Sequence, residues 1–256
     1  MSSVADPDVW MRPAVKTDGE KYYEYILVYV DDLLCISMEP LRPMQQIAKS
    51  LRFKKDKIEP PEFYLGARLE MKELNGKRMW TMTSKDYVKA AVENMEKHLE
   101  KWNRKLPSKA VTPMSSGYAP ETDGSPELST ELVTTYQEAI GILRWAIEIG
   151  RVDIHTEVSM LSSYQAAPRE GHLDQIYHIF AYLKQKPKLT LYFDPGLPNI
   201  DPSWSNGDAA DAFKETYRDA KEELPPDHMM VEPRGRSVST TAFVDASHAA
   251  NKVTRR

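Results

Sequence analysis

The sequence contains a single cysteine, Cys35, within the apolar run Leu33-Leu34-Cys35-Ile36. One cysteine excludes an internal disulfide, as is typical of a protein in a reducing compartment. No apolar stretch approaches the roughly 20 residues that cross a bilayer, and the acidic N-terminus lacks the basic-then-apolar order of a secretory signal. The sequence therefore predicts a soluble intracellular protein, in the cytoplasm or nucleus, with no membrane partner.

Several catalytic signatures are also missing. The chain has no glycine-rich phosphate loop, no paired-cysteine metal site and no nucleophile elbow. His172 and His178 are six residues apart in a predicted helix, so they face different sides and would make poor co-ligands. These absences argue against the common nucleotide-binding, zinc-binding and hydrolase sites.

The composition is that of a globular protein. The 256 residues are 41% hydrophobic and 28% charged, without a low-complexity tract or an internal repeat, and suffice for one large domain or two smaller ones. The net charge of −4 argues weakly against a nucleic-acid partner. However, residues 194–233 hold ten acids and three bases, a charge of −7, which leaves +3 for the rest of the chain. That remainder has room for a nucleic-acid surface.

The tetrad Tyr29-Val30-Asp31-Asp32 stands between the apolar runs 25–28 and 33–36. These runs predict two short strands over residues 24–37, joined at Asp31-Asp32. Unit charges about 4 Å apart near a protein surface repel by roughly 4 kcal/mol at an effective dielectric of about 20. A divalent cation would relieve this repulsion, which makes the pair a candidate metal site. The alternative is an ordinary hairpin, because Asp is common in turns.

The segment after the tetrad predicts a short helix and a second hairpin. A helix is predicted over residues 43–51, where Met44, Ile47 and Leu51 recur at helical spacing. Residues 63–71 and 78–83 flank Asn75-Gly76, a strong turn signal, and are predicted to pair. Gly66 inside the first of these strands suggests a bulge or a close approach by another backbone.

From Ser84 onward the apolar period changes from two to about 3.6 residues. Ser84 is the predicted N-cap of a helix that reaches about residue 102, and further helices are predicted at about 130–149, 152–166 and 170–186. Residues 107–126 are predicted as a loop, 194–236 as an irregular connector with a short helix near 209–222, and 238–245 as a strand. Lys97, Lys101 and Lys105 form an i, i+4 row, for which a solvated helix face and phosphate contact are alternatives.

Seven collinear blocks together resemble the reverse transcriptase of copia-type long-terminal-repeat retrotransposons. The blocks are Tyr29-Val30-Asp31-Asp32, Phe63-Tyr64-Leu65-Gly66, Val111-Thr112-Pro113-Met114, Tyr136-Gln137 with Ile140-Gly141, Gly150-Arg151-Val152-Asp153-Ile154, Pro168 with His172 and Tyr182-Leu183-Lys184, and Val244-Asp245-Ala246 with His248-Ala249. One tetrad is a weak signal, but seven blocks in order are hard to obtain by chance.

The resemblance implies an α+β fold, with antiparallel palm hairpins followed by a helical thumb bundle. Residues 1–83 would be the end of a polymerase palm, with the metal-binding hairpin and the primer-gripping turn, and residues 84–193 the thumb. Residues 194–236 would be an acidic, proline-rich connection, and 237–256 the truncated start of a ribonuclease H domain. Asp245 would be the first metal ligand of that nuclease, although Ser247 and Ala250 depart from the family's Asp-Ala-Asp-His-Ala-Gly pattern.

The resemblance also implies a chemistry. Asp31 and Asp32 would be catalytic carboxylates that hold Mg²⁺ or Mn²⁺ for two-metal nucleotidyl transfer. The partner would be an RNA/DNA primer–template duplex. Its contacts would come from the hairpin, the gripping turn and the thumb: Tyr29, Phe63, Tyr64, Leu65, Gly66, Lys97 and Lys101.

One essential part of that site is missing. The family's other catalytic Asp lies on a strand well upstream, whereas Asp6, Asp8 and Asp18 stand in polar, proline-containing sequence within the thirty residues before Asp31. We therefore expect a Pol polyprotein fragment that binds metal weakly, uses dNTP only if the missing palm is supplied, and is inactive alone. The alternative is a non-catalytic primer–template-binding remnant or a domesticated interaction protein.

Overall fold

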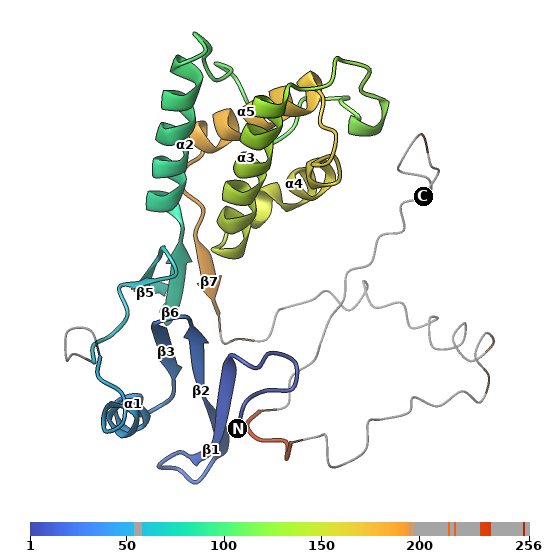
Figure 1. Cartoon of the computed structure of the whole chain (residues 1–256). Coiled ribbons are helices and arrows are strands. Elements are labelled where there is room, and N and C mark those ends of the chain that lie inside the picture. Colours follow the sequence, from blue (N-terminus) through green and yellow to red (C-terminus); the bar gives the residue numbers. More distant parts are fainter. Residues whose placement is uncertain are drawn as a thin grey trace. The chain divides into compact units, whose positions relative to one another are not determined.

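A computed structural model describes residues 1–53, 58–194 and 231–236, together with Gly196, Glu215, Arg218 and Val253. The chain divides into two compact units (Figure 1). We call the first the sheet unit; its described part is mainly residues 1–53 with 231–236. The second, residues 59–194, is the helical unit.

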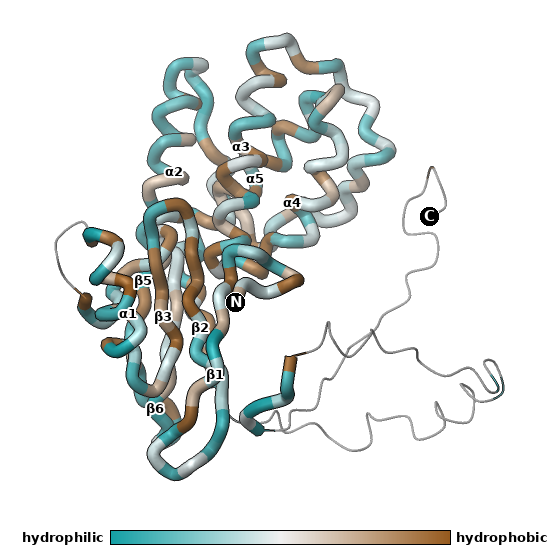
Figure 2. Tube along the Cα trace, turned by 60° about the horizontal axis from the view of Figure 1, so that its bottom comes forward, coloured by the Kyte–Doolittle hydropathy of each residue, from teal (hydrophilic) through white to brown (hydrophobic). Residues whose placement is uncertain are grey.

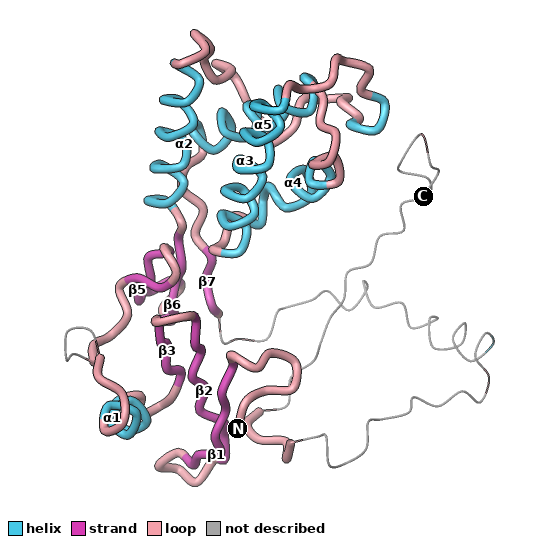
Figure 3. Tube along the Cα trace, viewed as in Figure 1, coloured by secondary structure: helices cyan, strands magenta, loops and turns pink. Residues whose placement is uncertain are grey.

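The sheet unit is a three-stranded antiparallel sheet with one helix. Strands β1 (Val9–Val15), β2 (Lys21–Tyr29) and β3 (Asp32–Ile36) lie in the order β1-β2-β3, and α1 (Leu41–Ala48) follows them (Figure 3). The register places Arg12 opposite Glu24 and Leu27 opposite Leu34. Pro13 lies in β1, which is an edge strand of the named sheet, and an edge is where a sheet tolerates proline.

Helix α1 packs against one face of this sheet. Because side chains alternate between the two faces of a strand, Arg12, Glu24 and Ile26 share a face. These three residues line a cavity of about 460 Å³ together with Pro43 and Ile47 of α1. The helix therefore covers the face that carries the Arg12–Glu24 pair.

The other face of the sheet is apolar but little buried. It carries Tyr25, Leu27, Leu34 and Ile36, and Figure 2 shows the apolar residues along β2 and β3. Ile36 is 52% exposed, and the other three are only half-buried. Among the described residues of this unit, only Glu24, Pro43 and Met44 are buried, so the unit has hardly any core of its own.

The helical unit begins and ends with strands of one antiparallel sheet. Its elements are β4 (Phe63–Tyr64), β5 (Ala67–Leu74), β6 (Lys77–Thr83), α2 (Lys85–Glu100), α3 (Thr130–Glu148), α4 (His155–Ser162), α5 (Glu170–Gln185) and β7 (Leu191–Phe193), with 3-10 turns at Pro120–Thr122 and Val152–Ile154. The strand order is β4-β5-β6-β7, and Trp80 of β6 lies opposite Phe193 of β7.

The four helices of this unit enclose its core. The fully buried apolar side chains include Val88 and Leu99 of α2, Ile140 and Leu143 of α3, Val158 and Leu161 of α4, and Leu173, Ile176 and Phe180 of α5. Burying each side chain of this size contributes roughly 1.5–3 kcal/mol. Tyr136 is also buried and donates a hydrogen bond to the Leu161 carbonyl at 2.7 Å, which ties α3 to α4.

A buried arginine joins the ends of α3 and α5. The Arg151 side chain is 1% exposed and donates Nε and Nη2 to the two carboxylate oxygens of Asp153, at 2.9 and 2.8 Å. Its Nη1 donates to the Lys186 carbonyl at 2.9 Å. Burial opposes ionisation of Asp153, but hydrogen bonds and charge from Arg151 outweigh it and lower the pKa of that carboxyl. All the polar groups of this arginine are therefore paired.

The α+β class predicted from the sequence is confirmed. The helices predicted at 84–102, 130–149 and 170–186 are α2, α3 and α5, and the hairpin around Asn75-Gly76 is β5–β6. Helix α4 ends at Ser162, four residues before the predicted end, and α1 spans Leu41–Ala48 rather than 43–51. No helix in the described ranges is long and apolar enough to cross a membrane.

Other local predictions were wrong. Tyr29 pairs with Asp32, so the turn of the acidic hairpin is Val30-Asp31 and Asp32 begins β3. Gly66 lies in the two-residue turn between β4 and β5, not inside a strand. Strands β1 and β7 were not predicted, because Pro13 interrupts the first and the second has only three residues.

The domain boundaries stay predictions. The compact helical unit begins at residue 59, so the segment 59–83, assigned above to the palm, belongs to the same unit as the helices. The predicted helix at 209–222 and strand at 238–245 lie outside the ranges described by the structure, apart from Glu215 and Arg218.

Candidate metal and nucleic-acid site

The acidic tetrad lies at the tip of the β2–β3 hairpin. Tyr29 and Asp32 pair across a two-residue turn of Val30 and Asp31. Val30 has φ of 53° and is 89% exposed. Positive φ is a true outlier for a β-branched residue and is found mainly at functional or strained turns. The turn therefore presents Asp31 and Asp32 in a conformation that Val30 does not favour.

Both carboxylates of the tetrad are exposed to solvent. Water screens their mutual repulsion, so this hairpin does not need a cation to be stable. In the described residues, no group of three or more His, Cys, Asp or Glu side chains is arranged to hold a metal ion. Mg²⁺ is commonly held by one or two carboxylates together with waters and substrate phosphates. Asp31 and Asp32 fit such a partial donor set, but not a complete protein site.

The predicted primer-gripping turn is a separate tight turn in the helical unit. Tyr64 pairs with Ala67, and Leu65 and Gly66 have φ of 52° and 87°. A Cβ on Gly66 would meet nothing within 4 Å, so the turn geometry itself, and not a close neighbour, calls for glycine. Phe63 is 51% exposed, and its ring lies 4.3 Å from the Arg68 guanidinium.

Lys97 and Lys101 lie exposed at the C-terminal end of α2. Neither forms an ion pair with a described residue, whereas neighbouring charges are engaged. Lys184 bonds Glu96 at 2.6 Å, and Arg104 bonds Asp174 at 2.7 Å. Both lysines are thus exposed to solvent and accessible to an external anion.

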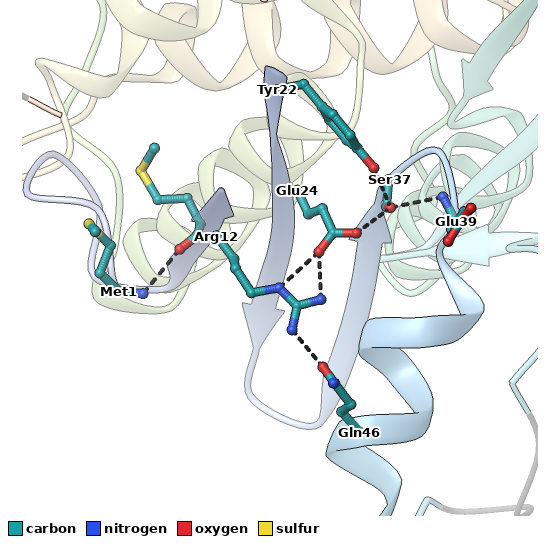
Figure 4. Close-up of polar contacts among 8 residues, drawn as sticks. Met1, Arg12, Tyr22, Glu24, Ser37, Glu39 and Gln46 are labelled. Carbon is teal, nitrogen blue, oxygen red and sulfur yellow. Dashed lines mark hydrogen bonds and ion pairs between the residues drawn. The ribbon is translucent and has the colours of Figure 1, made fainter. Parts of the chain in front are cut away.

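A polar network that the sequence did not reveal spans the sheet unit (Figure 4). Arg12 donates Nε and Nη2 to one oxygen of the buried Glu24 carboxylate, at 2.9 and 2.6 Å, and Ser37 donates to the other oxygen at 2.8 Å. Arg12 also bonds Gln46 of α1. Burial opposes ionisation of Glu24, but the bonds from Arg12 and Ser37 outweigh it and lower the pKa. The network joins β1, β2, α1 and the end of β3.

The remaining predicted site residue is not described by the structure. Asp245 and its neighbour His248 lie outside the described ranges. Tyr29 and Tyr64 are placed on β2 and β4, and Tyr29 is 45% exposed. The tetrad belongs to the sheet unit, and the gripping turn and Lys97 belong to the helical unit. The Arg12–Glu24 pair could have been found in the sequence only by predicting β1 and its register.

Two curated proteins are similar in sequence to this chain. It is 29% identical over 175 residues to a putative transposon Ty5-1 protein of Saccharomyces cerevisiae, covering 67% of this chain and 52% of the relative. It is 23% identical over 191 residues to the retrovirus-related Pol polyprotein from transposon TNT 1-94 of Nicotiana tabacum, covering 72% of this chain and 13% of the relative. The chain thus spans about half of the first relative and a small part of the second.

The other comparisons found nothing. No family model matches the chain, and no solved structure matches it. The two transposon relatives nevertheless support an origin of this sequence in a retrotransposon Pol polyprotein.

Proposed function

We propose that this chain, of retrotransposon Pol origin, is a reverse transcriptase fragment that cannot polymerise DNA alone. The observation that carries the proposal is the strained hairpin tip, which exposes Asp31 and Asp32 without a third metal-ligating side chain in the described residues. The Pol polyprotein relative and the order of the sequence blocks support the assignment to this enzyme class.

In this proposal Asp31 and Asp32 are half of a two-metal site. They would bind Mg²⁺ or Mn²⁺ weakly, and the bound ion would neutralise phosphate charge during nucleotidyl transfer. The two carboxylates would hold the ion, and the pairing of Tyr29 with Asp32 sets the position of Asp32 at the start of β3. A missing carboxylate from another strand would complete the site.

A primer-extension assay tests this proposal. The purified chain should incorporate no dNTP with Mg²⁺ or Mn²⁺, on primed RNA or primed DNA. The double variant Asp31→Asn/Asp32→Asn is the matched control and should behave identically. Robust incorporation by the wild-type chain that is lost in the variant would show a complete active site and contradict the proposed inactivity.

The second candidate function is primer–template binding without catalysis. It is favoured by the exposed Lys97 and Lys101, which have no ion-pair partner among the described residues. Each lysine–phosphate contact contributes about 0.9 to the slope of log affinity against log salt on duplex DNA. The variant Lys97→Ala/Lys101→Ala should therefore lower that slope by roughly 2.

The control for this binding experiment is Lys184→Ala, because Lys184 is paired with Glu96. Its salt slope should match that of the wild type. If the wild-type chain does not bind a duplex at low salt, or binds it equally at all salt concentrations, the chain has no phosphate-tracking surface and this function is wrong.

A further inference from the structure

The two edges of the sheet in the sheet unit differ. The outer edge of β1 is covered by the N-terminal residues, because Ser3 N–H donates to the Val9 carbonyl at 2.7 Å and Met11 N–H donates to the Met1 carbonyl at 2.9 Å. The outer edge of β3 pairs with no strand of the described residues. Among the described residues, one edge of the sheet is thus closed and the other is open.

The register of the hairpin shows which backbone groups of β3 are open. In a two-residue hairpin the residues that flank the turn exchange both backbone hydrogen bonds, and bonded and non-bonded pairs then alternate. Tyr29–Asp32 is the flanking pair, so Asp32, Leu34 and Ile36 bond to β2. The N–H and C=O groups of Leu33 and Cys35 therefore point outward from the sheet.

Strand β3 lacks the features that protect natural edge strands. Residues 33–36 contain no lysine, no proline and no glycine, and β3 pairs with β2 residue for residue without a bulge. Its side chains Leu34 and Ile36 continue the open apolar face formed by Tyr25 and Leu27. An extended segment added at this edge would satisfy the free backbone groups and extend the apolar face.

We propose that β3 is a strand-addition site and that its occupant is β3 of a second copy of this chain, antiparallel and centred on Leu34. In this register Leu33 of each copy exchanges backbone hydrogen bonds with Cys35 of the other, which uses the outward groups of both. The single charge, Asp32, lies opposite Ile36 of the other copy, so no like charges meet. The strand is self-complementary in backbone bonding and in charge.

The first test introduces a positive or a negative charge at the central residue, Leu34. Sedimentation of the full chain should show a monomer–dimer equilibrium that depends on protein concentration. Leu34→Lys and Leu34→Glu should each weaken the dimer by roughly tenfold or more, because like charges then lie directly opposite. An equimolar mixture of the two variants should dimerise again, which misfolding of either variant could not produce. A wild-type monomer at all concentrations, or variants that dimerise as well as the wild type, would overturn the proposal.

The second test fixes the register. With the native thiol removed by Cys35→Ser, Leu34→Cys should form an intermolecular disulfide, because directly opposed non-bonded pairs lie about 4.5 Å apart at Cα. The control is Cys35→Ser with Leu27→Cys, on the neighbouring strand of the same face, which should stay reduced. Equal crosslinking of both cysteines would mean that copies associate through the apolar face and not through the β3 edge, and would refute this register.

Discussion

Replacing Arg12 with methionine should destabilise the sheet unit, because the Glu24 carboxylate would stay buried without its cation. The Glu24 side chain is 7% exposed, whereas that of Arg12 is 45% exposed. Breaking a fully buried ion pair by removing one partner costs about 3–5 kcal/mol, and solvent screening of the half-exposed Arg12 lowers this to roughly 2 kcal/mol. Ser37 continues to bond one carboxylate oxygen, so the loss is partial.

The double variant Arg12→Met/Glu24→Met separates electrostatics from packing. It should be more stable than Arg12→Met alone, because no unpaired charge remains. The assay is hydrogen exchange of β2 at fixed pH, from which the free energy of opening is calculated. The control Lys16→Met removes the partly exposed pair with Glu20, whose carboxylate, unlike that of Glu24, is not buried, and should change this free energy by less than about 0.5 kcal/mol. A double variant that is no more stable than Arg12→Met alone would refute the reasoning.

The lowered pKa of Glu24 gives this prediction a pH dependence. Burial opposes ionisation, but the hydrogen bonds and charge of Arg12, with Ser37, hold the pKa of the folded carboxyl below its ordinary value. The pKa of an unfolded Glu is about 4.3, so the stabilisation is complete above that pH and is lost as the pH falls through the folded pKa. The difference in opening free energy between wild type and Glu24→Gln should therefore shrink in acid and stay constant at neutral pH. If the difference in opening free energy between wild type and Glu24→Gln does not change in acid, the lowered pKa of Glu24 is contradicted.

Three further predictions concern backbone strain, the helical core and local stability. Val30→Gly should stabilise the hairpin by about 1 kcal/mol, because it relieves a positive φ at a β-branched residue, and an unchanged opening free energy would mean an unstrained turn. Tyr136→Phe should cost about 0.5–1.5 kcal/mol in chemical denaturation, because the Leu161 carbonyl then keeps only its bond from the Tyr164 N–H, and a neutral effect would mean that the tyrosine hydroxyl does not stabilise the core. Hydrogen exchange should be faster in residues 20–37 than in 136–183, since the sheet unit has so few buried side chains; equal protection would mean that it folds well alone.

The elements that could be predicted from the sequence are those determined by local pattern. The stripe of Leu173, Ile176 and Phe180 identifies α5 because a helix places these positions on one side, where they are buried. Asn75-Gly76 identifies the β5–β6 turn because both residues accept positive φ. The acidic hairpin was found from its apolar flanks, but its turn was displaced by one residue, since Val30 gives no turn signal of its own.

The elements that could not be predicted depend on pairing between distant residues. The pairing of Arg12 with Glu24 spans twelve positions, and its bond to Gln46 spans thirty-four. Strand β7 forms only because β6 offers it an edge more than a hundred residues earlier in the chain. Solvent exposure is not determined by the local sequence either. The sequence indicates that Asp31 and Asp32 are adjacent, but only the fold shows that both face water without a third metal ligand in the described residues.

The open edge of β3 and the acidic tetrad lie on the same strand. Asp32 is the first residue of β3, so any strand that pairs with Leu33 and Cys35 also restrains the turn that carries both carboxylates. The described residues of the sheet unit bury too little apolar surface to hold that turn rigidly by themselves. A preorganised metal site needs ligands whose positions are fixed before the ion binds. Occupation of the β3 edge should therefore slow hydrogen exchange at the tetrad and strengthen its affinity for Mn²⁺, and both effects should disappear in Leu34→Lys, which keeps Asp31 and Asp32 intact.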